Sequence, residues 1–346
     1  AAAYLAKTYL YKAYRQSENN SVTGINSQDL QEVLTYTSAV LGSTYGLEED
    51  FAFNFLPGGY ENGKESLFAV QYSVDDGTQY GSLNWGDQLS TPQKLGCCDF
   101  HKPSQNLVNA FKTVNGLPDF DNFNNNDYNA ANDKADPRLF HTVALPGLPY
   151  KYNTELIYKN DWNRNSNVYG FYASLKENVD PSCSCFRNIN PFRANSKNRI
   201  VIRYADVLLM RAEALIELNR SNEALPLINQ VRQRAKQSTS MIPYATNANI
   251  ALYQDGVNIT WNQENARKAL RWERRLEFAM EGSRFFDLVR WGIADQVLND
   301  YFTKEKTRRP AIFSSAYFTK NKNEYIPIPQ NQIGYVKGIY KQNAGF

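Results

Sequence analysis

The stretch RYADVLLMRAEALIELNRSNEALPLINQVRQRA, residues 203–235, decides the fold. Apolar residues recur at spacings of three and four in both of its halves, namely Ala205, Leu208, Leu209, Ala212, Leu215 and Ile216, then Ala224, Leu227, Ile228 and Val231. Such spacing places each set on one face of an α-helix. The pattern predicts two helices joined by a tight turn at residues 219–221, with Ser221 capping the second helix. It is typical of a tetratricopeptide-like hairpin, although the full repeat signature is absent.

Residues 1–57 predict a second helical hairpin. AAAYLAKTYLYKAYRQ, residues 1–16, has helical spacing from its first turn and no capping residue before it. We therefore expect the sequence to be N-terminally incomplete. The next helix is predicted from Ser27 as its cap to Gly42 as its end. Its apolar face carries Leu30, Val33, Leu34, Thr37, Val40 and Leu41.

Residues 58–198 form an irregular insert rich in Gly, Asn, Asp and Pro. KPSQNLVNAFKT, residues 102–113, predicts a helix capped by Ser104, and SLFAVQYSV, residues 66–74, indicates a strand. Long irregular segments usually carry function. The predicted fold is mainly α, with tetratricopeptide-like hairpins forming a platform and a long loop-rich insert that contains a few short strands.

Composition excludes several classes of protein. The 346 residues carry 38 basic and 35 acidic side chains, so no strong field favours nucleic acid or an anionic membrane. The chain has only two histidines, which leaves little material for histidine metal sites or general bases. We predict no metal site, no cofactor and no nucleic-acid partner.

Four cysteines lie in two close pairs, Cys97 with Cys98 and Cys183 with Cys185. Their spacing fits neither a zinc site nor a small disulfide scaffold. Two alternatives stay open. One or two disulfides join the two segments in an oxidising compartment, or the thiols are free and buried.

RWERRLEFAMEGSRFFDLVRWG, residues 271–292, is dense in charge. Glu273, Glu277 and Glu281 lie four residues apart on one predicted helix face, and four arginines on that helix lie within pairing distance, Arg267, Arg271, Arg274 and Arg275. A glycosidase needs two carboxyls about 5 to 9 Å apart across a cleft, whereas successive turns present them side by side. We therefore predict an ion-pair brace, with the rings of this stretch in the core, namely Trp272, Phe285, Phe286 and Trp291.

Three stretches in this order resemble the SusD/RagB family of Bacteroidetes outer-membrane lipoproteins: residues 203–235, residues 267–292, and YIPIPQNQI at residues 325–333. Residues 45–73 and DPRLFHT, residues 136–142, are also similar to that family. The resemblance implies one SusD-like domain over residues 1–346. Its parts are a helical hairpin (1–57), a ligand-binding insert (58–198), the signature region (199–292) and a C-terminal segment (293–346).

The family resemblance further implies a non-enzymatic nutrient-binding lipoprotein on the surface of the outer membrane. It would capture oligosaccharides or peptides and deliver them to a SusC-like TonB-dependent transporter. Its membrane contact would be a lipid anchor on an N-terminal segment outside this sequence. A helical glycoside hydrolase and a tetratricopeptide scaffold for peptide tails are the alternatives.

Two tryptophans in the insert are the predicted centres of the ligand site, because amides and charges surround both. A sugar ring stacks on an aromatic face while amides and charges bind its hydroxyls, and a peptide could use the same groups. The alternative is that these rings pack onto the helical platform. The predicted ligand-binding residues are Trp162, Trp85, Tyr80, Asn84, Asp87, Asn163, Arg164 and Tyr169. No catalytic residue is predicted, and His141 beside Asp136 is expected to make a structural hydrogen bond.

Overall fold

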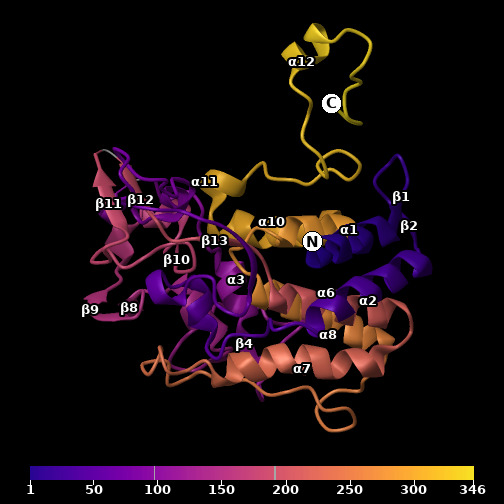
Figure 1. Cartoon of the computed structure of the whole chain (residues 1–346), viewed down its shortest axis with the longest axis horizontal. Helices are drawn as coiled ribbons and strands as arrows, with labels where there is room; N and C mark the ends of the chain where they lie inside the picture. The colour runs from indigo at the N-terminus through magenta and orange to yellow at the C-terminus, as the bar shows by residue number, and fades with distance from the viewer. Residues whose placement is uncertain (97, 191) are drawn as a thin grey trace.

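A computed structural model describes residues 1–96, 98–190 and 192–346 and is mainly helical (Figure 1). Its α-helices are α1 (Ala2–Ala13), α2 (Ser27–Leu41), α3 (Gln105–Ala110), α4 (Arg138–Thr142), α5 (Ser166–Tyr169), α6 (Tyr204–Glu217), α7 (Ser221–Gln237), α8 (Gln263–Glu277), α9 (Arg284–Arg290), α10 (Ala294–Arg308), α11 (Pro310–Phe313) and α12 (Gln330–Tyr335). The prediction that the fold is mainly α is therefore confirmed.

Short strands are scattered through the chain and pair in small antiparallel sheets. They are β1 (Tyr14–Gln16), β2 (Val22–Ile25), β3 (Ser66–Val70), β4 (Lys112–Val114), β5 (Leu117–Pro118), β6 (Lys134–Ala135), β7 (Val143–Ala144), β8 (Pro149–Tyr150), β9 (Asn153–Ile157), β10 (Ala173–Ser174), β11 (Phe186–Ile189), β12 (Phe192–Asn195) and β13 (Arg199–Arg203). The pairs are β1–β2, β3–β13, β7–β10, β8–β9 and β11–β12, and β4 lies between β5 and β6. Most of these strands lie in the insert, residues 58–198.

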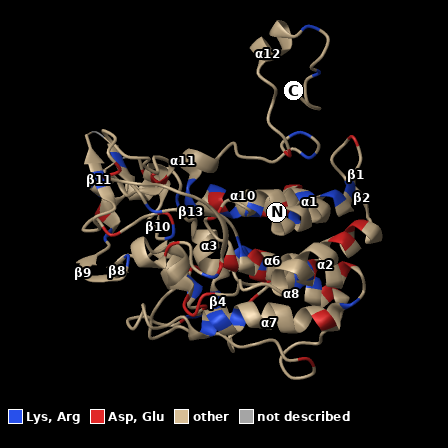
Figure 2. Cartoon of the chain, viewed as in Figure 1, with Lys and Arg blue, Asp and Glu red and all other residues tan. Residues whose placement is uncertain are grey.

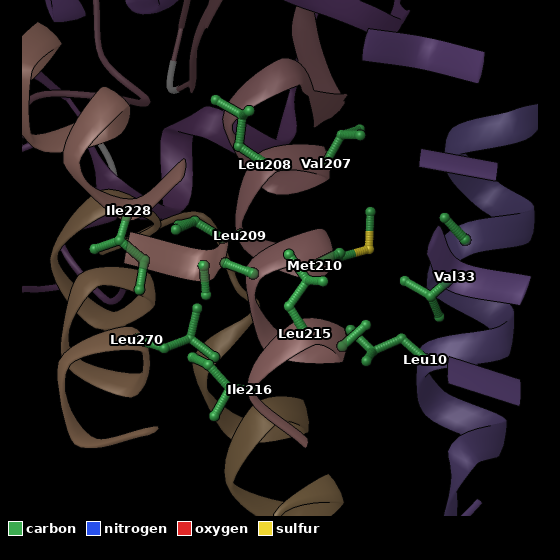
Figure 3. Close-up of a cluster of buried hydrophobic side chains, with 14 of the residues drawn as sticks. Leu10, Val33, Val207, Leu208, Leu209, Met210, Leu215, Ile216, Ile228 and Leu270 are labelled. Carbon is green, nitrogen blue, oxygen red and sulfur yellow. The ribbon is translucent and has the colours of Figure 1, made fainter. Parts of the chain in front are cut away.

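Helix α6 is the centre of the main hydrophobic core. Figure 3 shows Leu10 of α1 and Val33 of α2 on one side of it, and Ile228 of α7 and Leu270 of α8 on the other. Met210 of α6 reaches toward the first pair. The periodic apolar pattern that predicted the helices therefore produces two helical pairs, α1 with α2 and α6 with α7, that share one core.

Two predicted caps lie one residue from the true ones. The side chain of Asn26, not of Ser27, caps α2, because its Oδ1 accepts a hydrogen bond from Asp29 N at 2.9 Å. Ser221 is the first residue of α7, and its N-cap Arg220 makes no capping hydrogen bond. A capping side chain must lie outside the helix to reach the free N–H groups of the first turn. The Ser104 cap and the helix end at Gly42 are confirmed.

The charge-dense helix α8 is a brace, but its partners differ from the prediction. The Glu277 carboxylate accepts hydrogen bonds from Arg138, at 2.9 Å, from Arg203 and from Arg234. The Glu273 carboxylate accepts from Arg138 and, at 3.0 Å, from Arg232. All these side chains are buried, and they come from segments far apart in the sequence.

The prediction that the glutamates of α8 pair with arginines of the same helix is therefore wrong. Arg267 binds Glu217 of α6 at 2.7 Å, and Arg274 binds Asp206 of α6 at 2.8 Å. The four-residue spacing puts Glu273 and Glu277 on the inward face, and arginines at other positions point around the helix to different neighbours. Both signs of charge alternate along the central helices in Figure 2.

Cys183 and Cys185 form a disulfide with each other. For Cys183 and Cys185, the predicted disulfide to the segment at residues 97–98 is therefore wrong, and so is the alternative of free thiols. Cys97 lies outside the described residues.

The last part of the chain, which carries α12, stands away from the helical body (Figure 1). Gln342 closes this segment on itself, because its side chain accepts from Ile328 N at 2.8 Å and donates to Ile328 O at 2.9 Å. Ile326, Tyr335 and Ile339 are exposed on it.

Candidate ligand-binding site

A cavity of about 700 Å³ lies between α3, the loop at residues 121–125, the corner between α8 and α9, and α10. That volume is typical of small-molecule sites. Three kinds of side chain line it: the rings of Phe123, Trp272, Phe278, Phe285 and Tyr301, the amides of Asn106, Asn124 and Asn125, and the ionisable groups of His101, Lys102, Asp121, Arg275, Arg284, Asp300 and Lys304. The cavity thus combines aromatic faces with hydrogen-bonding groups.

The corner after α8 shapes one wall of this cavity. Helix α8 ends at Glu277, and the chain turns through Met280 and Gly282, whose φ angles are 65° and 91°. Such positive φ values suit glycine and do not continue a helix. Helix α9 then starts at Arg284.

The prediction that Phe285 and Phe286 are core residues is wrong, because both rings of α9 are exposed. Phe285 is 37% exposed and lines the cavity, and Phe286 is 58% exposed and lines a separate cavity of about 350 Å³. Trp291, in contrast, is buried in the main core, as predicted.

Trp272 lies between core and cavity. Its ring is half-buried and meets the edges of Phe120 and Phe123, with centroids 5.5 and 4.9 Å away. Its Nε1 donates a hydrogen bond to Ala110 O at 3.2 Å. The prediction of a packed ring holds, and the same ring also lines the cavity.

Two arginines of the cavity wall carry positive charge without a carboxylate partner. Arg275 donates to Asn106, and its guanidinium lies 4.8 Å from the centroid of Phe123 and 5.1 Å from that of Trp272. Burial, and then repulsion from Arg284, hold the pKa of Arg275 well below its ordinary value. Among the described side chains, Arg275 forms no ion pair.

Arg284 is half-buried, and burial lowers its pKa to about 10 although Asp287 opposes that shift. The Asp287 carboxylate is already bound by Arg274 and Arg290. Within the described part of the chain, Arg284 has neither an ion pair nor a hydrogen-bond partner for its side chain. Of the other charged side chains in the lining, Lys102 pairs with Asp99, Asp121 with Lys268 and His101 with Glu177. Asp300 and Lys304 form no ion pair with a described side chain.

Trp162, the first predicted ligand residue, is only 4% exposed. Its ring packs against Tyr150 and Tyr158, with both centroids 5.4 Å away, in a small core of the insert. An enclosed ring offers no face for a sugar, so in this conformation the residue is structural. The polar residues that suggested a site are neighbours of Trp162 along the sequence, whereas the neighbours of its ring in space are tyrosines.

Three predicted polar contacts are buried as well. Asn84 pairs with the backbone of Asn195, and the Asp87 carboxylate accepts from the Asn195 amide at 3.2 Å. The Asn163 amide oxygen accepts from Tyr158 at 2.8 Å. The Asp87 carboxylate and the Asn163 amide oxygen are thus engaged inside the insert, whereas the buried Asn84 Nδ2 has no hydrogen-bond partner among the described residues. Ligand contact by these three residues stays a prediction.

The remaining four predicted residues lie nearer the surface. Tyr80 and Tyr169 are 50% and 46% exposed. Trp85 and Arg164 are half-buried, and Arg164 donates to Cys98 O at 2.8 Å. All eight lie outside the cavity lining, although Asn163 also accepts from Lys102, which lines it.

His141 makes structural hydrogen bonds, but not with Asp136, which instead binds Arg138. The buried His141 donates from Nε2 to Ser238 O at 2.9 Å and accepts at Nδ1 from Tyr152 at 3.1 Å. Burial lowers the pKa of His141 to about 4. The folded protein therefore keeps this imidazole neutral in mild acid.

We expect the free energy of unfolding to fall by about 3 kcal/mol between pH 6.5 and pH 4 because of His141 alone. The unfolded chain takes up this proton near pH 6.5, whereas the folded chain does so only near pH 4. Urea unfolding at several pH values should show a flatter pH dependence in His141→Gln than in the unsubstituted protein. His101→Gln is the control. Its hydrogen bond to Glu177 raises the pKa of His101, so its stabilisation is present in acid and is lost as pH rises. Equal slopes in His141→Gln and the unsubstituted protein would refute the assignment.

Comparison with known proteins gives the family. The family model described as the SusD family matches residues 64–346. The chain belongs to the SusD family. A SusD-like protein of Formosa agariphila is 35% identical over 183 residues, which are 51% of this chain and 30% of that protein.

Solved SusD structures share the fold. A SusD homologue from Bacteroides thetaiotaomicron has a TM-score of 0.68 at 19% identity, with 100% of this chain and 63% of that chain covered. A SusD-like carbohydrate-binding protein from Bacteroides fragilis has a TM-score of 0.62 at 24% identity, with 86% of this chain and 52% of that chain covered. The chain thus spans less than two thirds of the length of these SusD proteins.

SusD-family proteins are binding proteins and not enzymes, in agreement with the sequence-based assignment. Of the helices in residues 1–96, 98–190 and 192–346, none is long and apolar enough to cross a membrane. The same residues contain no group of three or more His, Cys, Asp or Glu side chains placed to hold a metal ion.

Proposed function

We propose that this SusD-family protein captures oligosaccharides at the cell surface, in the cavity between α3, the α8–α9 corner and α10. It then delivers them to a SusC-like TonB-dependent transporter in the outer membrane, to which an N-terminal lipid anchor outside this sequence holds it. The observation that carries the proposal is the joint lining of aromatic rings and amides in one cavity of a SusD-family chain. The carbohydrate-binding relative from Bacteroides fragilis supports the ligand class.

The chemistry of the lining suits sugars. The C–H faces of a pyranose stack on aromatic rings, and Phe285 is the ring whose exposure leaves most room for such contact. The amide oxygens of Asn106 and Asn124 already accept from Arg275 and from Asn109 and Arg308, so their NH2 groups are what remains to donate to hydroxyl groups. The Asn125 amide donates to Asn122, and its oxygen can accept from a hydroxyl group. A peptide remains the second ligand class for the same groups.

In this proposal each predicted part of the domain has its own role. The insert over residues 58–198 supplies one wall of the cavity, and the signature region together with the C-terminal segment supplies the other. The helical pairs are the tetratricopeptide-like platform that packs against the transporter. The exposed rings of Tyr80 and Tyr169 stay a prediction for ligand contacts outside the cavity.

The structure favours neither alternative function. The carboxylates that a hydrolase would have needed on α8, Glu273 and Glu277, are fully buried among guanidinium groups. A scaffold for peptide tails would leave the cavity without a role.

Substituting Phe285 tests the proposed site. We expect Phe285→Ala to weaken oligosaccharide binding about tenfold, because loss of a stacking ring costs on the order of 1.4 kcal/mol. Calorimetric titration of the purified protein with neutral and acidic oligosaccharides measures the change. Phe286→Ala is the matched control, since this adjacent ring lines the other cavity and its loss should leave the affinity unchanged. Equal effects of the two substitutions would remove the cavity from the proposal.

A further inference from the structure

The cavity wall has a charge imbalance that the packing of the chain does not explain. Elsewhere in the interior guanidiniums share a carboxylate, as Arg138, Arg203 and Arg234 do at Glu277. Arg275 and Arg284 line the cavity near enough to repel each other, and neither forms an ion pair with a described carboxylate. Two half-buried cations side by side are unfavourable unless an anion approaches them.

The two arginines differ in how they are held. Arg275 is fixed by its hydrogen bond to Asn106 and by the rings of Trp272 and Phe123. Arg284 follows the turn at Gly282, and its guanidinium has no hydrogen bond to any described residue. Its five N–H groups remain free for a ligand in the cavity, and a guanidinium is suited to two parallel hydrogen bonds with a carboxylate or sulfate.

We propose that the ligand is an acidic oligosaccharide, whose carboxylate or sulfate group is bound by Arg284 with Arg275 beside it. This inference rests on the proposed function, since it specifies the sugar that the cavity takes. Aromatic rings and amides surround the two arginines and would bind the uncharged part of the sugar. An acidic peptide could reach the same charges, but the flat rings beside them favour a sugar ring.

Binding of matched probes tests the inference. The carboxylate probe is trigalacturonic acid, the sulfate probe is a sulfated carrageenan oligosaccharide, and the neutral probes are maltotriose and cellotriose. Triglutamate serves as the acidic peptide. We expect at least one acidic sugar to bind ten or more times more tightly than either neutral sugar, and its affinity to fall when salt is raised from 50 to 500 mM.

Arg284→Gln should abolish the preference for the acidic sugar over the neutral sugars. Arg284 forms no hydrogen bond or ion pair with a described residue, and its guanidinium lies 5.9 Å from the centroid of the Trp291 ring. This substitution should therefore change the thermal midpoint of unfolding little, which separates a ligand role from a structural one. Arg284→Lys should keep part of the preference, because lysine retains the positive charge but lacks the planar guanidinium that makes two parallel hydrogen bonds. Arg220→Gln removes one exposed charge that pairs with Glu223 and should change nothing.

Each outcome decides a separate point. Neutral sugars bound as tightly as acidic ones, or an acidic preference that survives Arg284→Gln, would overturn the inference and leave the proposed function standing. Triglutamate bound in an Arg284-dependent way, with no sugar bound, would overturn the inference and the proposed function together, as would no binding of any sugar. A preference for trigalacturonic acid or for the carrageenan probe identifies which anion the site takes.

Discussion

Replacing Glu277 with glutamine is expected to lower the free energy of unfolding by about 3 to 5 kcal/mol. The carboxylate accepts hydrogen bonds from Arg138, Arg203 and Arg234, and all four side chains are buried. Burial alone would raise the pKa of Glu277, but the guanidiniums of Arg234, Arg203 and Arg138 hold it far below its ordinary value. The group is therefore ionised in the folded protein, and its loss leaves three cations without their shared anion.

Equilibrium unfolding in urea measures this loss as a lower midpoint. Glu223→Gln is the matched control, because it removes a carboxylate that pairs with Arg220 at the surface. Exposed pairs contribute about 1 kcal/mol or less. If Glu277→Gln cost no more than Glu223→Gln, the central ion-pair cluster would not be what holds the helices to the insert. Should Glu277→Gln fail to accumulate as soluble protein while Glu223→Gln does so normally, the same conclusion would follow as from a lower midpoint.

Trp162→Ala is expected to cost about 3 to 5 kcal/mol of stability and to leave oligosaccharide affinity unchanged. The ring fills the small core of the insert between Tyr150 and Tyr158, and its removal opens a cavity there. It does not line the proposed ligand cavity.

The midpoint of urea unfolding and the affinity for an oligosaccharide should be measured on the same preparation. Trp85→Ala is the comparison, because this half-buried ring should cost less stability. A Trp162→Ala protein with an unchanged midpoint and lost binding would return Trp162 to the ligand site, as its polar neighbours in the sequence suggested.

The helices were predictable because local periodicity determines them. The apolar spacing in residues 27–41 and 204–237 identified α2, α6 and α7 close to their true bounds, and Ser104 correctly located the start of α3. The errors at Ser27 and Ser221 are one residue each. The neighbouring Asn26 takes the cap of α2, whereas no side chain caps α7. Glu273 and Glu277 were correctly predicted to brace the fold.

Partners and sites were not predictable in the same way. The guanidiniums that bind Glu277 come from residues 138, 203 and 234, and no local pattern indicates which distant arginines meet it. The cavity likewise joins the asparagine-rich loop around Phe123 to the corner at Phe285. Trp162 misled for the opposite reason, because its neighbours along the chain are polar while its neighbours in space are tyrosines.

The ion-pair cluster of Glu277 with Arg138, Arg203 and Arg234 holds the fold together at positions that differ from those lining the cavity. Its charges on β13, α4, α7 and α8 neutralise one another only when all four elements are in place, so cohesion depends on a few positions far from any ligand. The cavity rim owes little to that cluster, since Phe285 and Arg284 follow the end of α8 and Phe123 lies in a loop. Substitution at the rim should therefore change the chemistry of the cavity at little cost to folding.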